Sequence, residues 1–475
     1  MKKIFIATSA SVILLLILGI TSVNSSDKIQ DAVGINKLIN TGMMPSVIVD
    51  AGENIDKVKL KSGFIHGLPD IINQNEILDS VSQLEPKSWR MSTIPIYNFV
   101  NDNVRSKHDT QITFVLSDLF FSVYGVSNNQ YSLDLESECD SSNKTCIQSF
   151  EQFKTIWEYF MEDLMIKTVQ NKIHIDYYDV YNEPDGIFNG FTESQKFEIV
   201  KITHDIIKKH VPNAKIVAPS TNQFDEQHLT NFIRYIEENN LELTALSWHE
   251  FDDPDAMLEH VKKMRFIIDS TFEKKQNLKI QEIHINEYGS NDNQSVPGWA
   301  VRWLYSLEKA NVDVANRACW DMGSGSSVWS NCWNGLNGML DQDNKTPENI
   351  YFVYKAYAEL DKNRIFTESL GSHIISLASK NDQTEKIHLL VGNYDRNQNN
   401  VVINIQNYPY DANTIQADIM RIPNPASASN VITEIQTLPV SNGMISLSID
   451  SFENGDAYDI VLSAETRYVD QIPGT

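Results

Sequence analysis

Eight strand-like segments, each followed by a helical pattern, fill the middle of this chain and most constrain its fold. The strand-like segments are 62–67, 88–93, 111–121, 174–184, 214–221, 243–251, 279–290 and 313–322. Eight alternating strand–helix units over about 300 residues predict a (β/α)8 barrel with a parallel sheet. An open doubly wound sheet is the structural alternative. It has less support, because no glycine-rich nucleotide-binding loop follows the first strand.

The C-terminal part of the chain has a different pattern. From about residue 362 onward, short strand-like runs are separated by turn residues, which is typical of a β-sandwich. Residues 46–61 also read as strands, and we expect them to cross over and pair with the C-terminal sheet, because their edges would otherwise be exposed. We therefore predict an α/β fold, with a (β/α)8 TIM barrel over 63–361 and an appended C-terminal β-sandwich domain formed by 27–62 and 362–475.

The N-terminal residues have the layout of a secretory signal. Lys2 and Lys3 precede an apolar stretch, 4–20, and then small polar residues. This order predicts a cleaved signal peptide over 1–26, and hence a secreted, extracellular or periplasmic protein. A retained membrane anchor is the alternative reading.

The four cysteines fall into two local pairs. Cys139 and Cys146 flank a polar turn, and Cys319 and Cys332 flank a second loop. Disulfides persist in exported proteins, so the spacing predicts two short-loop disulfides. Free thiols are the alternative. A zinc site is disfavoured, because no CxxC motif or nearby histidine pair is present.

The charge balance limits the partners. The chain has 39 basic and 63 acidic residues, a net charge of −24, which disfavours nucleic acid and anionic membranes. A soluble protein that handles neutral substrates, small or polymeric, fits this balance. The acidic stretch 341–348 lacks the glycine and terminal glutamate of a calcium loop, so it reads as a turn. We expect no metal and no organic cofactor, and the oligomeric state stays open.

Polar and aromatic residues gather at the predicted C-terminal strand ends, where the active site of a barrel of this kind lies. The residues at these ends are His66, Arg90, Asp118, Asn182, Glu183, Trp248, His249, Glu250, Glu287, Tyr288, Trp320 and Asp321. Alternation along a strand points Glu250 away from the side that His249 faces. Trp329 and Trp333 lie in the loop after the eighth predicted strand, which the second cysteine pair would tether, and they either line the site or pack under the loop.

Two glutamates suggest a reaction. Glu183 and Glu287 each follow an asparagine at the end of a predicted strand, in "YNEP" and "INEYG". Two carboxylates flanking one glycosidic bond can hydrolyse it with retention when they lie about 5 Å apart. One carboxyl group protonates the leaving oxygen while the other attacks the anomeric carbon. The proximity of like charges would raise the pKa of one of them.

With these two motifs the chain resembles the retaining glycoside hydrolases of clan A. Further segments, "SGFIHGLPD", "SWRMS" and the appended β-sandwich, most resemble glycoside hydrolase family 39, which includes β-xylosidases and α-iduronidases. The resemblance implies that Glu183 is the acid/base and Glu287 the nucleophile. It also implies that Asn182 hydrogen-bonds the sugar 2-hydroxyl.

The resemblance extends to Arg90, which would orient Glu287, to His249, and to Trp320 as part of a sugar-binding floor. We expect Tyr288, His66 and Asp118 to contact substrate as well. The predicted function is thus hydrolysis of O-glycosidic bonds by a double displacement, like that of a β-xylosidase. The expected substrate is an oligosaccharide, a polysaccharide or another glycoside. A transglycosidase with the same site is one alternative, and a catalytically silent carbohydrate-binding barrel is another.

Overall fold

The computed structural model describes residues 46–58, 63–69, 74–124, 149–188, 190–323, 328–370, 373–425 and 430–464. These residues belong to one compact unit, Pro45–Thr475. The expected signal segment and the expected Cys139–Cys146 disulfide lie outside the described residues. Of the helices within the described ranges, none is both long and apolar enough to cross a membrane.

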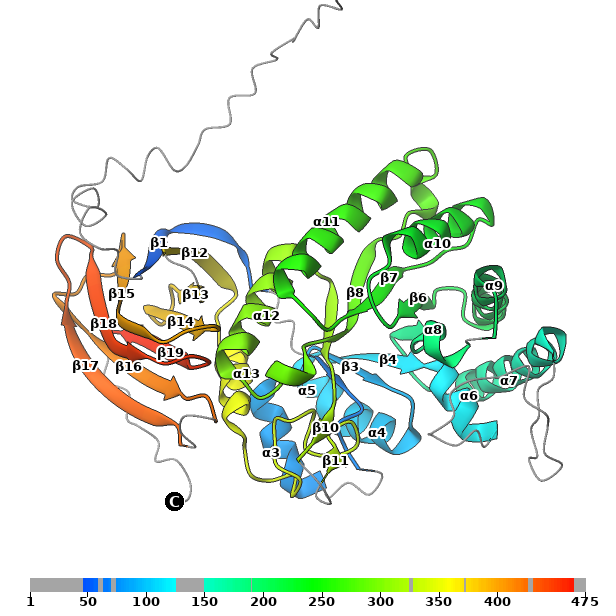
Figure 1. The fold of residues 1–475 in the computed structure, drawn as a ribbon, viewed down its shortest axis with the longest axis horizontal. Coiled ribbons are helices and arrows are strands. Elements are labelled where there is room, and N and C mark those ends of the chain that lie inside the picture. The colour runs from blue at the N-terminus through cyan, green and yellow to red at the C-terminus, as the bar shows by residue number, and fades with distance from the viewer. Residues whose placement is uncertain are drawn as a thin grey trace, which may run out of the picture. The chain divides into compact units, whose positions relative to one another are not determined.

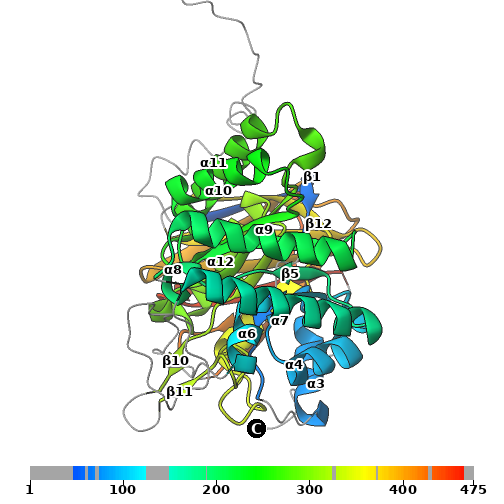
Figure 2. The ribbon, with the colours of Figure 1, turned by 90° about the vertical axis from the view of Figure 1, so that its right-hand side faces the viewer.

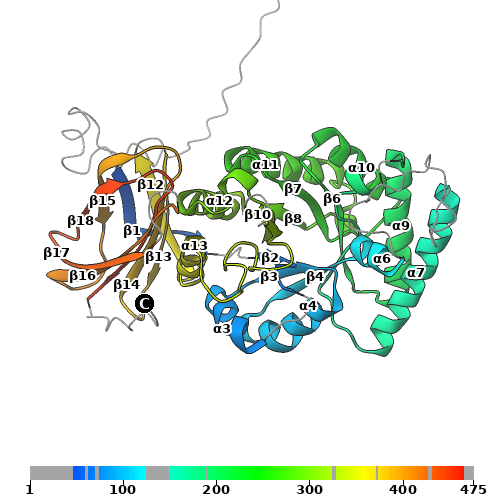
Figure 3. The same ribbon diagram turned by 60° about the horizontal axis from the view of Figure 1, so that its bottom comes forward.

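Eight parallel strands close into a barrel, with the last strand pairing with the first (Figure 3). This confirms the predicted barrel. The strands are β2 (Gly63–Ile65), β3 (Ser88–Met91), β4 (Gln111–Val115), β5 (Tyr177–Asp179), β6 (Lys215–Thr221), β7 (Ala245–Glu250), β8 (Glu282–Tyr288) and β9 (Val314–Arg317).

Helices follow the strands and cover the outside of the barrel. They are α3 (Gln74–Leu84), α4 (Ile94–Phe99), the π-helix η1 (Val100–Val104), α5 (Arg105–His108), α6 (Leu116–Tyr124), α7 (Phe150–Gln170), α8 (Pro184–Ile187), α9 (Glu193–His210), α10 (Glu226–Glu238), α11 (Pro254–Thr271), α12 (Pro297–Ala310) and α13 (Asn349–Ala358), with short 3-10 turns η2 (Gln276–Leu278) and η3 (Asn291–Asn293). Figure 2 shows α7 and α9 side by side. Thr192 and Gln195 form a capping box that starts α9.

The third barrel strand is shorter than the sequence pattern predicts. The expected strand 111–121 ends at Val115, and α6 begins at Leu116. The buried residues Leu116 and Phe120 are four positions apart, which is a helical spacing, and Phe120 packs on Trp157 of α7. The prediction of a strand over 116–121 was therefore wrong, and Asp118 lies in the first turn of a helix.

Two other expected strands also end early. Segment 174–184 is a strand only at Tyr177–Asp179, because Glu183 adopts a left-handed backbone and Pro184 starts α8. Segment 313–322 is a strand only to Arg317. Beyond it, β10 (Asp321–Met322) pairs with β11 (Trp329–Ser330) in a separate two-stranded sheet.

The C-terminal domain is a nine-stranded, mostly antiparallel sheet in the order β17-β16-β19-β14-β13-β12-β1-β15-β18. Its end strands β17 and β18 contact each other, so the sheet encloses its own apolar core. The strands are β1 (Ser46–Lys57), β12 (Asn363–Leu370), β13 (Ile374–Asn381), β14 (Lys386–Asn393), β15 (Gln398–Gln406), β16 (Thr414–Ile422), β17 (Ile432–Pro439), β18 (Ile445–Phe452) and β19 (Ala457–Ser463).

Strand β1 comes before the barrel in the chain yet lies inside this sheet, as Figure 1 shows. It pairs antiparallel with β12 and parallel with β15, which agrees with the crossover expected for this segment. On the barrel side, helix α12 packs against β14. A Cβ on Gly298 would lie 2.0 Å from the carbonyl oxygen of Asn393, so this close approach requires glycine.

Candidate active site

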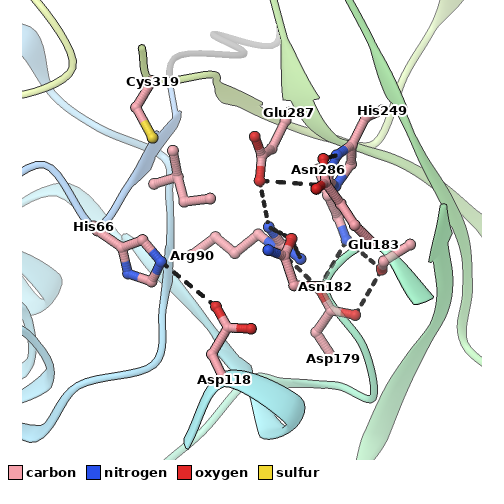
Figure 4. Close-up of polar contacts among 12 residues, drawn as sticks. His66, Arg90, Asp118, Asp179, Asn182, Glu183, His249, Asn286, Glu287 and Cys319 are labelled. Atoms are coloured by element: carbon pink, nitrogen blue, oxygen red, sulfur yellow. Dashed lines mark hydrogen bonds and ion pairs between the residues drawn. The ribbon is translucent and has the colours of Figure 1, made fainter. Parts of the chain in front are cut away.

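The barrel brings together two carboxylates and an imidazole at the C-terminal ends of its strands (Figure 4). Glu183 follows β5, His249 lies on β7 and Glu287 lies on β8. His249 Nδ1 is 3.2 Å from Glu183 Oε1, and its Nε2 is 3.8 Å from Glu287 Oε1. One oxygen of each carboxylate and an imidazole nitrogen all lie within 4.8 Å of one another. Glu183 and Glu287 therefore come close enough to act on one bond.

The Asn-Glu-Pro sequence explains how Glu183 leaves the strand. Glu183 has φ of 50° and ψ of 60°, a left-handed conformation that is uncommon outside glycine and asparagine. Its backbone N–H donates to the Ser220 carbonyl, and the Asn182 N–H donates to Ser117 Oγ. Pro184, which lacks an N–H, occupies the first turn of α8 without loss. The turn thus directs the Glu183 carboxylate toward His249.

Arg90, at the end of β3, holds the nucleophile candidate. Its side chain is fully buried and its five N–H groups are all used. Nη1 donates to Glu287 Oε1 over 2.9 Å, and Nε donates to Asp179 Oδ2 over 2.8 Å. Both terminal nitrogens donate to Asn182 Oδ1, and Nη2 also donates to the Tyr181 carbonyl. Arg90 therefore fixes Glu287 and Asn182 in one rigid arrangement.

A second group of buried polar residues supports Arg90, and sequence reasoning missed all of it. Asp179 accepts from Asn286 Nδ2 over 2.9 Å and from Ser220 Oγ over 2.6 Å, in addition to Arg90. Asn286 also donates to Ser220 Oγ. One signal was available: Asp179 is a charged residue within an otherwise apolar and aromatic strand, and a buried charge needs a partner.

The two glutamates differ in environment. Burial raises the pKa of Glu287, against the opposing effect of His249 and Arg90. Burial also acts on Glu183, but the hydrogen bond and charge of His249, together with Arg90, lower the pKa of that carboxyl below its usual value. The Glu183 side chain is 37% exposed and that of Glu287 is 11% exposed. In the free protein the proton of the pair is thus favoured on Glu287.

His66 and Asp118 lie on the other side of Arg90 from His249 (Figure 4). His66 Nε2 is 3.8 Å from Asp118 Oδ2. Burial and the nearby Arg90 charge lower the pKa of His66 to about 3, so the ring is neutral near pH 7. Burial raises the pKa of Asp118 to about 7. The negative charges of Glu287 and Asp179 add to this effect, and the positive charge of Arg90 opposes it. Both residues therefore lie near Arg90 and Glu287, and their contact with substrate stays a prediction.

Two expected aromatic contacts have different outcomes. Trp320, half-buried after β9, packs edge-on against Phe251 at 5.0 Å, and Phe251 packs against His249 at 5.5 Å, so Trp320 borders the site. Tyr288 is not brought to the site. Its hydroxyl is 2.9 Å from that of Tyr354 on α13, so its side chain is buried against the helices outside the barrel. Alternation along β8 explains this correction, because Tyr288 follows inward-facing Glu287.

Glu250 also points away from the site, as alternation predicted. It accepts hydrogen bonds from Trp248 Nε1 over 2.6 Å and pairs with His260 at 2.8 Å. The predicted Cys319–Cys332 disulfide is present and closes a loop after β9. Trp333 follows this disulfide and stacks on the His66 ring, with 4.4 Å between centroids and 20° between planes. The loop thus reaches the same side of the site as Asp118.

A metal ion is the other ligand that carboxylates and an imidazole can hold. Among the described residues, Glu183, His249 and Glu287 form the group with suitable ligand atoms. Arg90 already donates to Glu287 Oε1, so a cation bound there would face a guanidinium within a few ångströms. The donor set therefore suits a neutral ligand and proton transfer better than a cation.

Comparison with known proteins supports the fold. No family model matches the chain. A curated 3-O-β-L-arabinopyranosyl-α-L-arabinofuranosidase from Bifidobacterium pseudocatenulatum is 24% identical over 196 residues, which span 35% of this chain and 20% of that protein. The matched part is thus a fifth of the relative's length.

Solved structures match over nearly the whole described chain. N2152 from Neocallimastix frontalis has a TM-score of 0.68 at 18% identity and covers 89% of this chain and 100% of its own. The GH39 enzyme from Xanthomonas axonopodis pv. citri has a TM-score of 0.61 at 12% identity, covering 90% and 98%. A monomeric β-xylosidase from Caulobacter crescentus CB15 has a TM-score of 0.60 at 11% identity, covering 89% and 100%. These likenesses show that the chain shares their fold, a barrel joined to a β-sandwich.

Proposed function

We propose that the protein is a retaining glycoside hydrolase. The observation that carries the proposal is the proximity of Glu183 and Glu287, whose nearest oxygens lie within 4.8 Å at the C-terminal ends of β5 and β8. Retaining enzymes hold their carboxyl groups about 5 Å apart, whereas inverting enzymes leave about 6.5–9.5 Å for a water molecule. The spacing here favours direct attack on the sugar by a carboxylate.

The surroundings of the two carboxylates assign their roles. Glu287 is the more buried, and Arg90 holds one of its oxygens, which leaves the other oxygen for attack on the anomeric carbon. Glu183 is more exposed and lies where a leaving group can depart into solvent. Glu183 protonates the leaving oxygen, a covalent ester forms on Glu287, and Glu183 then deprotonates the water that cleaves the ester.

In the free protein the pKa directions of the two glutamates run opposite to their proposed roles. The pKa directions favour the proton on Glu287, while the reaction needs it on Glu183. A sugar bound over the pair displaces water from Glu183 and buries it, which raises the pKa of Glu183. An oxygen of the leaving group also accepts a hydrogen bond from protonated Glu183. Both effects move the proton to the group that donates it.

The comparisons and the sequence motifs support a proposal for the substrate class. Proteins of the same fold include a β-xylosidase, a GH39 enzyme and an α-L-arabinofuranosidase from Thermotoga maritima. We infer that this chain is a member of glycoside hydrolase family 39 and acts on a glycoside of a neutral pentose, such as xylose or arabinose. Asn182, held by Arg90, is placed to hydrogen-bond the 2-hydroxyl of that sugar.

We also propose that the protein is exported. The support is the signal-like order of Lys2, Lys3 and the apolar stretch that follows them, together with the Cys319–Cys332 disulfide. Disulfides persist in oxidising compartments. N-terminal sequencing of the protein recovered from a secreting host tests this. A start after the first 20–30 residues supports export with cleavage, and recovery of Met1 contradicts it.

Hydrolysis of a panel of aryl glycosides, including xylosides, arabinofuranosides and glucosides, tests the enzyme proposal. Glu287→Ala should abolish hydrolysis of every substrate. Glu183→Ala should keep most of kcat/KM on 2,4-dinitrophenyl glycosides, whose leaving group needs no proton, and lose it on poorer leaving groups. Its kcat should fall on every substrate, because the water that cleaves the ester has lost its base. Glu250→Gln is the matched control, because its carboxyl is near in sequence to His249 but points away. Equal rates for wild type and Glu287→Ala on all substrates would contradict the proposal.

A further inference from the structure

Trp333, His66 and Asp118 form a cluster beside the carboxylate pair that the proposed chemistry does not use. Trp333 stacks on the His66 ring, and His66 Nε2 lies 3.8 Å from Asp118 Oδ2. Trp333 is 39% exposed, although it is among the largest apolar side chains. An exposed aromatic ring beside polar groups is the usual surface on which a sugar face stacks.

His66 supplies independent evidence that a ligand belongs here. The residue is 5% exposed, and its Nδ1 is buried without a hydrogen-bond partner among the residues that the structure describes. Leaving a buried polar nitrogen unpaired destabilises the fold, and native proteins rarely keep such a group without a reason. Because the ring is neutral, Nδ1 is either a donor or an acceptor, and a sugar hydroxyl satisfies both cases.

The backbone holds His66 in place for this role. His66 has φ of 43°, a left-handed conformation that costs free energy outside glycine. The adjacent Gly67 N–H donates to the Cys332 carbonyl, and Asn337 bonds both the N–H and the carbonyl of Ile65. The disulfide-closed loop thus clamps the end of β2 and brings Trp333 over the imidazole.

The position of the cluster shows which part of a substrate it meets. Figure 4 places His66 and Asp118 across Arg90 from Glu183 and His249. Glu183 is the group proposed to protonate the leaving part, so the leaving part lies on its side. The Trp333 cluster lies on the opposite side, toward the sugar that becomes attached to Glu287 and whatever precedes it.

We propose that Trp333, His66 and Asp118 form a second sugar-binding subsite on the non-leaving side of the cleaved bond, so that the protein releases a disaccharide or a longer fragment rather than a single sugar. This inference rests on the proposed glycosidase function. It adds a substrate preference: the protein favours glycosides in which at least two linked neutral sugars precede the bond that is cut.

The test compares kcat/KM for 4-nitrophenyl β-xyloside with 4-nitrophenyl β-xylobioside, and for the glucoside with the cellobioside, with chromatography of the first product. The inference expects wild type to favour the disaccharide by about tenfold or more and to release it intact. If wild type cleaves none of these or any other glycoside of the panel, the proposed function itself fails. If it cleaves the monosaccharide as well as the disaccharide, only this inference is overturned.

Variants then assign the preference to the cluster. Trp333→Ala should lower the disaccharide-to-monosaccharide ratio of kcat/KM by roughly tenfold, and Trp333→Phe should restore most of it. His66→Phe keeps a ring beneath Trp333 but removes Nδ1, so it should lower the ratio as well. Trp329→Ala is the matched control, because Trp329 packs against Gly335 in the same loop. An equal fall in the control, or an unchanged ratio in Trp333→Ala, would overturn the subsite.

Discussion

Arg90 Nη1 donates a hydrogen bond to Glu287 Oε1 over 2.9 Å, with the guanidinium fully buried and the carboxylate nearly so. Arg90 thus does two things: it neutralises buried negative charge in the barrel, and it holds the proposed nucleophile in position. Removing the Arg90 guanidinium would leave the buried carboxylates of Asp179 and Glu287 without their cationic partner. Stability and activity therefore depend on the same side chain.

Replacing Arg90 should damage both properties. Arg90→Met leaves buried carboxylates uncompensated, which typically costs about 3–5 kcal/mol. Arg90→Lys keeps a charge but cannot make the five hydrogen bonds, so kcat/KM should fall by roughly 100-fold through misplacement of Glu287. Urea unfolding and steady-state kinetics measure the two effects. A lysine variant with wild-type kcat/KM would contradict the role of Arg90 in positioning Glu287.

Asp179 should matter to activity although it touches no substrate. Asp179→Asn keeps the shape but weakens the bonds to Arg90 and Ser220, and kcat/KM should fall about 10- to 100-fold with little change in KM. Asp176→Asn is the control, since Asp176 pairs with Arg105 at 2.8 Å before β5, away from the strand ends that carry the site. Its kcat/KM should stay within about twofold of wild type, because part-exposed ion pairs contribute little. A similar loss in both variants would argue against a positioning role.

His249 should set the pH dependence through Glu183. Its hydrogen bond and charge lower the pKa of Glu183, so His249→Phe should raise that pKa. A general acid with a higher pKa stays protonated to higher pH, so the falling alkaline limb of kcat/KM should move to higher pH. A shift to lower pH would contradict the assignment.

Ionisation of the buried Asp118 carboxyl should lower the free energy of unfolding as pH rises. Its pKa in the fold is about 7, above the ordinary value near 3.9, so the folded state holds its proton more tightly than the unfolded state. Its contribution to stability is therefore present below pH 4 and is lost as pH rises through 7.

Asp118→Asn removes this titration. The groups that act on Asp118 are Arg90, Glu287, Asp179, Ser117 and His66, and all of them remain in the variant. The difference in free energy of unfolding between variant and wild type should shift in favour of the variant from pH 4 to pH 8. Urea unfolding across this range measures it, and a difference that does not change with pH would contradict the raised pKa.

The sequence predicted the barrel because strand and helix patterns alternate regularly, and it predicted both glutamates because each ends a strand. The buried polar residues that support Arg90 were not predicted, because they meet only when the barrel closes. Asp179, Ser220 and Asn286 meet from three different strands, so no local pattern announces their contact.

The local sequence pattern could have placed Tyr288 and Asp118 correctly. Tyr288 directly follows Glu287 on a strand, so alternation already placed the two side chains on opposite faces, as it did for His249 and Glu250. Asp118 was expected on a strand because apolar residues surround it. The spacing of Leu116 and Phe120 instead fits a helix that packs on α7.

Covalent trapping tests the central claim most directly. Wild type is incubated with 2-deoxy-2-fluoro glycosides of the sugars it hydrolyses, bearing 2,4-dinitrophenyl leaving groups, and the labelled peptide is found by mass spectrometry. The fluorine slows breakdown of the glycosyl-enzyme, so the two-glutamate mechanism predicts one sugar attached to Glu287. A label on Glu183 would reverse the assigned roles. Hydrolysis that gives an inverted anomer and no covalent adduct would contradict the retaining mechanism.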